Sequence, residues 1–491
     1  MTSATRVPTR PVIAGFHPDP SVCRVGEAFY VACSSFEYAP GVPVFRSVDL
    51  VDWTLVGHAL DRPDQLALAR VGPSGGIYAP TLRHHDGRFW LVTTNVDDGP
   101  GHLVVSAADP AGPWSAPVRI EEAGGIDPDL AWDDLGTCYL TWSDGGILQA
   151  EVDLASGRLL TEPRRLWSGT GGRDPEGPHL YRVGDTWYLV LAEGGTGLGH
   201  AVSVARGPAP TGPFEPFDEN PVLTARGTSR TVQSTGHGDL VERSDGSWAL
   251  VHLGVRSAGR FPGWHVLGRE TFAVQVDWVN GWPRVGEPLE PPETAGWSQR
   301  LDATVPELPA DWVGAAVFPD EVLRRAEGRW RLSSPAESAG EHDARTFVGR
   351  RQEHRTTTVR ARIDATDGVG GLEVRIDPRH ALTLEVDGGR VRAVARIGSV
   401  TTPLGEWHGE PGDDPGGVVL ELRADPGADG AGGPDVLVAC VERSGLRTEL
   451  GRLDGRYLSS EVAGGFTGRM VGAVCSRGHV DVLDLEYAGA T

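Results

Sequence analysis

Short runs of alternating apolar and polar residues, separated by glycine and proline, extend along the whole chain. The runs are rich in aromatic and β-branched residues, and the 67 glycines and 37 prolines fall largely between them. Alternation with a period of two is typical of strands with one buried face, and Gly and Pro mark the turns. No long segment has the 3.6-residue period of an amphipathic helix. The pattern therefore predicts an all-β protein.

Five segments within the first 290 residues share one pattern, in which a small or acidic residue and an apolar pair precede a turn and an aromatic-rich strand. Their strand anchors are spaced by 60, 49, 49 and 61 residues and are Phe29, Phe89, Cys138, Trp187 and Trp248. Repeats of ~40–60 residues, each with a hairpin turn, are typical of β-propeller blades. The repeat predicts a five-bladed β-propeller.

The composition changes after the last repeat. Residues 291–307 are rich in Pro and Glu, which is typical of a linker, and alternating strands then resume without the repeat. This organisation predicts a β-propeller over 1–292, a linker over 293–310 and a C-terminal β-sandwich over 311–491.

One position of the repeat changes its residue type from blade to blade. Counting back ten or eleven residues from each anchor reaches Asp19, Ala79, Asp127, Glu176 and His237. A position that only maintains the fold would hold Gly or an aliphatic residue throughout; the alternative is that these acids cap turns. Two carboxylates across a sugar-sized gap are the minimal apparatus for hydrolysing a glycosidic bond, and a third raises the pKa of the acid. The repeat therefore predicts a glycosidase site at the propeller axis.

The charge balance limits the partners of the protein. With 67 acidic and 45 basic residues, its formal charge is −22, which disfavours nucleic acids and anionic membranes because both need basic patches. The five scattered cysteines include no CxxC pair, so they support neither a disulfide framework nor a zinc site. The N-terminus lacks the apolar core of a signal peptide, and no stretch of about 18 apolar residues occurs. We therefore expect a cytoplasmic protein.

Six motifs, in order along the chain, resemble those of glycoside hydrolase family 43. They are GFHPDPS around Asp19, GGIYAPT at 75–81, GIDPDL around Asp127, DPEGPHLY around Glu176, TGHGDLVE around His237 and LGRETF around Arg269. The segments at 34–53, 347–354 and 464–472 resemble the branch of β-xylosidases and α-L-arabinofuranosidases, whose C-terminal sandwich is concanavalin A-like. The resemblance covers nearly the whole chain.

The resemblance implies a role for each motif residue. Asp19 is the general base, Asp127 tunes the pKa of the acid and orients it, and Glu176 is the general acid. Arg269 binds the sugar in the −1 subsite. His237 lies below the sugar, where some family members hold a calcium ion largely through water; a hydrogen-bonded core histidine is the alternative. We expect no cofactor to be required.

Aromatic rings offer sugars an apolar face, and four of them are candidates for substrate binding. Phe36, Tyr78 and Trp142 follow innermost or second strands, and Phe466 lies in the sandwich segment that projects over the pocket in relatives. Tyr78 stands where many family members have Trp. Asp129 stands where many have Ser, and it adds a charge near the site.

We interpret the chain as an inverting, exo-acting β-D-xylosidase of short xylo-oligosaccharides. Asp19 and Glu176 face each other from different blades, which predicts a carboxyl separation above the ~5–5.5 Å of retaining enzymes, toward the ~6.5–9.5 Å that admits a water. α-L-Arabinofuranosidase activity is the alternative or a second activity, because the two sugars present similar hydroxyl groups. The oligosaccharide is the partner we expect, and a homo-oligomer is left open.

Two more remote alternatives fit the sequence less well. Fructosidases of the invertase type place an Arg-Asp-Pro motif well before a Glu-Cys acid motif, whereas here Arg-Asp-Pro directly precedes Glu176 and no Glu-Cys pair exists. A catalytically silent carbohydrate-binding propeller would be expected to lose at least one of the three acids, and none is lost.

Overall fold

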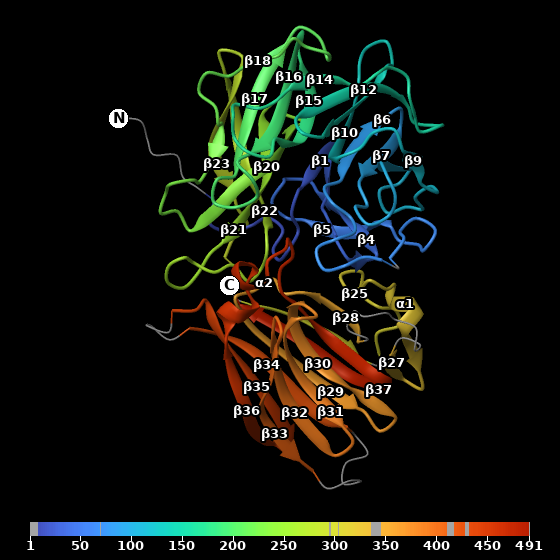
Figure 1. Ribbon diagram of the computed structural model, residues 1–491, viewed down its shortest axis with the longest axis vertical. Coiled ribbons are helices and arrows are strands. Elements are labelled where there is room, and N and C mark those ends of the chain that lie inside the picture. Colours follow the sequence, from blue (N-terminus) through green and yellow to red (C-terminus); the bar gives the residue numbers. More distant parts are fainter. Residues whose placement is uncertain are drawn as a thin grey trace. The chain divides into compact units, whose positions relative to one another are not determined.

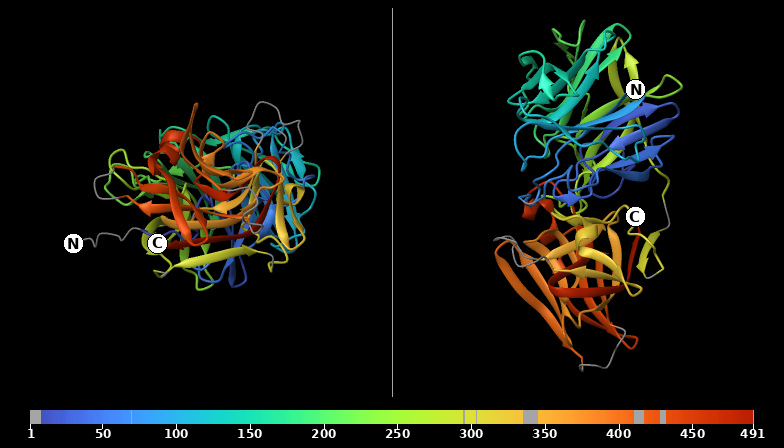
Figure 2. Two further views of the ribbon diagram at one scale, coloured as in Figure 1. Left: turned by 90° about the horizontal axis from the view of Figure 1, so that it is seen from below. Right: turned by 90° about the vertical axis from the view of Figure 1, so that its right-hand side faces the viewer.

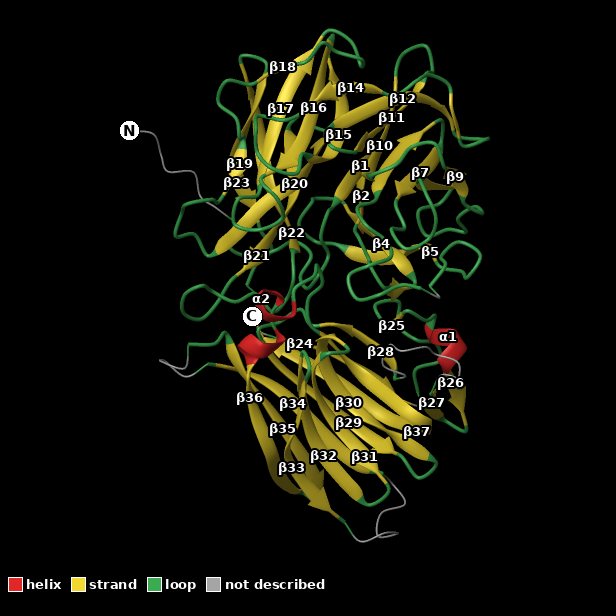
Figure 3. Cartoon of the chain, in the orientation of Figure 1, coloured by secondary structure: helices red, strands yellow, loops and turns green. Residues whose placement is uncertain are grey.

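The computed structural model describes residues 8–68, 70–293, 296–302, 304–334, 345–409, 417–427 and 432–490. It divides into two compact units, the first of residues 1–256 and 269–291, the second of 257–268 and 292–491. Strands dominate both (Figure 3), which confirms the all-β prediction. The helical segments of the described residues are short: α1 (Pro319–Val322), η1 (Gly455–Leu458) and α2 (Ser460–Ala463). None of the described helices is long and apolar enough to cross a membrane.

The first unit is a five-bladed propeller (Figures 1 and 2), as the repeat predicts. The first strand of each blade packs against the first strands of its neighbours, and the fifth returns to the first, so that these strands form the innermost ring. They are β1 (Ser21–Val25), β6 (Thr81–His85), β10 (Ile126–Trp132), β15 (Glu176–Val183) and β20 (Val232–Glu242).

The outer strands follow in antiparallel order within each blade. Blade one continues with β2 (Ala28–Ala32), β4 (Gly41–Ser47) and β5 (Thr54–Leu60), with β3 (Tyr38–Ala39) between β2 and β4 along the chain. Blade two has β7 (Arg88–Thr93), β8 (His102–Ala107) and β9 (Val118–Ile120). Blade three has β11 (Cys138–Ser143), β12 (Ile147–Asp153), β13 (Arg158–Leu159) and β14 (Arg164–Trp167). Blade four has β16 (Thr186–Glu193), β17 (Ala201–Gly207), β18 (Glu215–Pro216) and β19 (Leu223–Thr224). Blade five has β21 (Trp248–Arg256), β22 (Glu270–Val279) and β23 (Trp282–Leu289).

The segment before blade one closes the ring. The backbone N–H groups of Val12 and Ile13 donate to the carbonyl of Thr271 on β22, and the Thr271 N–H donates back to Ile13. The His17 N–H donates to the carbonyl of Arg269 at 3.0 Å. The start of the chain is therefore held against blade five beside two of the motif residues, Asp19 and Arg269.

The second unit is a sandwich of two antiparallel sheets that share one long strand, β37 (Met470–Ala490). Residues 470–478 of β37 pair with β28 (Thr346–Arg351) and β30 (Gly368–Asp377), and the sheet continues through β31 (His380–Asp387), β32 (Arg390–Ile397) and β33 (Val400–His408), with β25 (Val313–Ala315) beside β28. Residues 479–490 pair with β24 (Trp297–Asp302), β27 (Arg329–Ser333) and β29 (Thr356–Asp364), followed by β34 (Val418–Pro426), β35 (Asp435–Arg443) and β36 (Leu446–Asp454), with β26 (Leu323–Ala326) beside β27.

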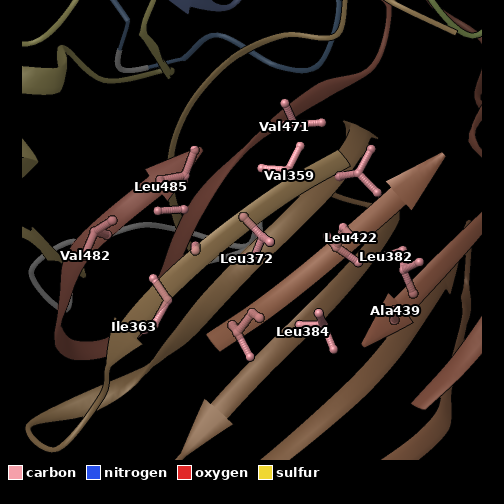
Figure 4. Close-up of a cluster of buried hydrophobic side chains, with 14 of the residues drawn as sticks. Val359, Ile363, Leu372, Leu382, Leu384, Leu422, Ala439, Val471, Val482 and Leu485 are labelled. Carbon is pink, nitrogen blue, oxygen red and sulfur yellow. The ribbon is translucent and has the colours of Figure 1, made fainter. Parts of the chain in front are cut away.

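Alternating residues of both sheets meet in the core of this unit, which Figure 4 shows for one cluster of side chains. Leu372, Leu382 and Leu384 come from one sheet, and Val359 and Leu422 from the other. The period-two pattern of these strands is thus the cause of the sandwich, because it places one apolar face on each sheet.

The structure corrects the predicted boundaries in two places. The stretch 293–310, predicted as a linker, contains β24, which pairs with β37 and so belongs to the sandwich; residues 294, 295 and 303 lie outside the described residues. Residues 257–268, predicted as part of the propeller, belong to the second unit. Proline content marks exposed chain, but it does not show which sheet an edge strand joins.

Candidate active site

β-Bulges near the start of the innermost strands present the candidate catalytic residues. The pairing register shifts after Ile126 in β10, after Glu176 in β15 and after Gly236 in β20. The residue that follows each shift has a left-handed backbone, with φ of 55° at Asp127, 54° at Gly177 and 45° at His237. Such conformations are rare outside glycine, and bulges re-aim side chains next to functional sites.

The same register corrects the alignment of the blades. Asp19, just before β1, has φ of 55° and matches Asp127 and His237, whereas the matching residue of blade four is Gly177. Glu176 therefore stands one residue before the repeated position, paired with Ala192 of β16. A Cβ at residue 177 would lie 2.7 Å from Nε2 of His237, so only glycine fits there.

Asp19 is a buried carboxylate in an ion pair. Its Oδ1 accepts from Nη1 of Arg269 at 2.8 Å, and its Oδ2 accepts from the Ser34 hydroxyl at 2.6 Å. Nδ1 of His237 lies 3.5 Å from Oδ1. Burial works against ionisation, but the Arg269 guanidinium, then His237 and the Ser34 hydrogen bond, hold the pKa of Asp19 below its ordinary value. Asp19 is therefore ionised at neutral pH, as a general base must be.

Asp127 and Glu176 form a coupled pair of carboxyl groups. Burial, and after it the charge of Asp19, raises the pKa of Glu176 to about 7. Burial and then the charge of Glu176 raise the pKa of Asp127 well above its usual range. The two groups therefore release their protons in two separate steps. The Gly177 N–H donates to Oδ2 of Asp127 at 3.0 Å and favours its ionised form, so we assign the remaining proton to Glu176.

Replacing Asp127 by Asn tests this assignment. Asp127 and Glu176 interact electrostatically, so removing the negative charge of Asp127 should lower the pKa of Glu176 and move the alkaline limb of kcat/KM down by about one pH unit. Rates between pH 4 and 9 on an aryl glycoside measure the limb. Asp153→Asn, an exposed carboxylate at the end of β12, is the control and should leave it in place. An alkaline limb that does not move in Asp127→Asn would show that Asp127 carries the proton itself.

His237 and its surroundings test the expected calcium ion. Burial lowers the pKa of His237 to about 4, so its ring is neutral at pH 7. No group of three His, Cys, Asp or Glu side chains that could hold a metal occurs within the residues described. The protein side chains therefore do not fit an ion bound by direct ligands, and we derive no step from one. An ion held largely through water stays a prediction.

The aromatic candidates fall in three different places. Phe36 is buried against Arg269, whose Cζ lies 5.7 Å from the ring centroid, and its ring centroid is 5.5 Å from that of Tyr78. Burial raises the pKa of Tyr78, and nearby carboxylates, Asp19 and Asp127 among them, raise it further. Both rings thus lie beside the catalytic groups, and their stacking on a sugar stays a prediction.

Trp142 lies in the hydrophobic cluster of blades two and three and is 1% exposed, comparable with Phe36, which is 2% exposed. Its predicted stacking on a sugar also stays a prediction. Phe466 lies in the second unit, between α2 and β37, and its predicted place over the pocket stays a prediction.

Beyond the positions of the catalytic residues, a buried ionic network joins the innermost strands of the blades. Arg83 of β6 donates to Asp129 Oδ1 of β10 at 2.7 Å and to Asp239 Oδ2 of β20 at 2.8 Å. Ser21 of β1 donates to the same oxygen at 2.8 Å, and Tyr181 of β15 donates to Oδ1 of Asp239. The charge that Asp129 brings is therefore paired with Arg83. The network fastens the five inner strands to one another.

Sequence reasoning missed this network and two loop residues near the base. Read two residues further, the blade spacing reaches the polar residues Ser21, Thr81, Asp129 and Asp239, whereas His179 lies three residues after Glu176. That signal was available in the repeat. Ser34, which donates to Asp19, and Thr196, whose hydroxyl accepts from Arg269 Nη1 at 3.1 Å, lie in loops that carry no repeated pattern.

Comparisons with known proteins agree with this geometry. The family profile described as glycosyl hydrolases family 43 matches residues 8–283, and the profile described as the beta-xylosidase C-terminal concanavalin A-like domain matches residues 304–483. The chain is 37% identical to a non-reducing end alpha-L-arabinofuranosidase of Bacteroides ovatus, over 95% of this chain and 90% of that protein.

Two further similar proteins are named as xylosidases. A xylosidase/arabinosidase of Butyrivibrio fibrisolvens is 43% identical over 57% of this chain and 56% of its own length. The crystal structure of a xylan beta-1,4-xylosidase from Bacillus halodurans superposes with a TM-score of 0.84 at 28% identity, covering 98% of this chain and all of that one.

Proposed function

Because this chain belongs to glycosyl hydrolase family 43 and is therefore a glycoside hydrolase, we propose that it releases single β-D-xylose residues from the non-reducing ends of short xylo-oligosaccharides. The observation that carries the proposal is the pairing of a buried, ionised Asp19 with a Glu176 whose pKa of about 7 keeps its proton at mildly acid pH. A base and an acid that stay in opposite protonation states are what glycoside hydrolysis needs.

In the proposed reaction Asp19 takes a proton from a water molecule, whose oxygen bonds to the anomeric carbon. The bond from that carbon to the glycosidic oxygen breaks, and Glu176 donates its proton to the departing oxygen. Asp127 holds the proton on Glu176 through its charge. Arg269 keeps Asp19 ionised through the 2.8 Å ion pair and is the residue that we expect to bind a sugar hydroxyl.

We expect this single displacement to invert the anomeric configuration. Asp19 lies just before the inner strand of blade one and Glu176 begins that of blade four, and because these blades are not neighbours in the ring we expect the two carboxyl groups to be far enough apart to admit a water. Hydrolysis of a β-xyloside should then release α-xylose first. Proton NMR within the first minutes identifies the anomer before mutarotation. β-Xylose as the first product, or a fluorosugar-trapped Asp19, would contradict inversion.

α-L-Arabinofuranosidase activity is the second candidate, because the relative aligned over 95% of the chain carries that name. Parallel measurement of kcat/KM on 4-nitrophenyl β-D-xylopyranoside and 4-nitrophenyl α-L-arabinofuranoside separates the two. A larger value on the xyloside, together with release of xylose from xylobiose, supports the first proposal. A larger value on the arabinofuranoside with no action on xylobiose would replace it by the second, and no hydrolysis of either would overturn both.

A further inference from the structure

Glu193, the last residue of β16, has a buried carboxylate that the proposed reaction does not use. The side chain is 3% exposed and accepts four hydrogen bonds. Its Oε2 accepts from the backbone N–H groups of Thr170 at 3.0 Å and Gly172 at 3.1 Å. Its Oε1 accepts from the Thr170 hydroxyl at 2.5 Å and from the Ser203 hydroxyl. Every one of these donors is neutral.

A buried carboxylate without a cationic partner is costly, so its presence calls for a reason. The ion pairs found among the described residues include none with Glu193. Burial disfavours the charge, but the hydrogen bonds from Ser203 and Thr170 hold the pKa of Glu193 below its ordinary value. The side chain is therefore an ionised acceptor, and three of its four hydrogen bonds go to one segment, residues 170–172.

That segment leads directly to Glu176. The end of β16 contacts this segment and the residues after it at successive points. Glu193 accepts from the N–H groups of residues 170 and 172, and the Gly194 N–H donates to the Arg173 carbonyl at 2.7 Å. Ala192 then pairs with Glu176. Three of the four residues 169–172 are glycines, so this stretch has little stiffness of its own. A Cβ at residue 172 would lie 2.8 Å from Oε2 of Glu193, so the glycine permits the close approach.

On the basis of the proposed function, we propose that Glu193 is a positioning residue that fixes the segment carrying the general acid Glu176. The side chain touches no reacting atom; it acts through the backbone of residues 170–173. The loop after Glu193 also reaches the site, because Thr196 accepts a hydrogen bond from Arg269. A change at Glu193 therefore disturbs the position of the proton donor first. A displacement of about 1 Å in such a group can lower the rate of the reaction about 10²-fold.

The test compares substrates that differ in their need for an acid. kcat/KM is measured for Glu193→Ala, Glu193→Gln and wild type on xylobiose, whose leaving group must be protonated, and on 2,4-dinitrophenyl β-D-xylopyranoside, whose leaving group need not be. We expect Glu193→Ala to lose at least about tenfold more on xylobiose than on the activated glycoside. Glu193→Gln should restore most of the loss, because its amide oxygen still accepts from the two N–H groups while its NH₂ donates to the hydroxyls of Thr170 and Ser203.

Asp133→Ala is the matched control. Asp133 also holds a turn of the propeller, by accepting from Leu135 N–H, Thr137 N–H and the Tyr139 hydroxyl, but it lies in the hairpin between β10 and β11. Its loss should leave the ratio of kcat/KM on xylobiose to kcat/KM on the activated glycoside unchanged. If Glu193→Ala does not fold, Thr170→Val, which removes one donor on an exposed residue, should change the ratio in the same direction by a smaller factor.

Equal losses on both substrates in Glu193→Ala, or a ratio no different from that of Asp133→Ala, would overturn the positioning role. A failure of the proposed function is distinguishable, since Glu176→Ala would then show no dependence on the leaving group either. If the wild type hydrolyses only arabinofuranosides, the matching pair of an arabino-oligosaccharide and an activated aryl arabinofuranoside replaces the xylosides, and the same outcomes decide.

Discussion

Replacing Asp19 by Asn is expected to reduce kcat/KM by about 10²–10⁴-fold on every substrate, whatever its leaving group. Asn has the shape of Asp but cannot take a proton from water, so the attacking nucleophile is lost for natural and activated glycosides alike. Arg269, 2.8 Å from Asp19, can still donate to the amide oxygen, and the Ser34 hydroxyl, 2.6 Å away, can turn to accept from the amide NH₂, so binding should change less than turnover.

Rates on xylobiose and on 4-nitrophenyl β-D-xylopyranoside measure the effect. Asp49→Asn is the control, because Asp49 is also a hydrogen-bonded carboxylate of blade one, which accepts from Ser47 and from backbone N–H groups after β4. Its replacement should leave both rates within about twofold, as is usual for a substitution away from a site. A loss below tenfold in Asp19→Asn, or a loss confined to xylobiose, would rule out Asp19 as the base.

Replacing Glu176 by Ala is expected to cost about 10²–10⁴-fold on xylobiose but far less on 2,4-dinitrophenyl β-D-xylopyranoside. The sugar alkoxide that leaves from xylobiose needs a proton, whereas dinitrophenolate is stable without one. The alkaline limb near pH 7 should also disappear on the activated substrate, because the group whose pKa is about 7 has been removed. The pH–rate profiles of Glu176→Ala and of the wild type on both substrates provide the measurement.

Asp174→Asn is the matched control for Glu176. Asp174 is an exposed carboxylate in the same segment, paired with Arg173 at 2.9 Å, and its charge adds to the raised pKa of Glu176. Its removal should lower the alkaline limb slightly without creating a dependence on the leaving group. Equal losses on natural and activated substrates in Glu176→Ala would remove Glu176 from the role of the acid.

Both predictions start from residues that the sequence alone singles out. The turn and strand of each blade are local patterns, and five copies of one pattern place equivalent residues on one axis whatever the details of packing. Asp19, Asp127 and Glu176 were found in this way, although Glu176 stands one residue before the repeated position, and the period-two strands predicted the sandwich as well. Arg269, just before β22, was singled out as a candidate to hold the base in its charged form, and the resemblance to a family added the −1 subsite.

The tertiary structure decided what depends on register and on contacts between distant segments. The bulge in β15 moves Glu176 one residue away from the repeated position, and sequence spacing does not reveal a single unpaired residue. The membership of Trp142 in the hydrophobic cluster of blades two and three also depends on contacts between distant strands, which its position on β11 does not reveal. The pairing of β24 into the sandwich depends on β37, which is more than 150 residues away along the chain.

The sequence by itself determined the fold class, the order of the two domains and the three acids, because these follow from periodicity and from repeated local patterns. Only the tertiary structure decided how the acids are controlled. Three sets of contacts join segments from 21 to 250 residues apart: the Arg269–Asp19 ion pair, the Arg83 network and the hydrogen bonds between Glu193 and residues 170–172. The energies of such buried charges depend on desolvation and on distances of a few tenths of an ångström. Neither quantity is encoded in a pattern along the chain.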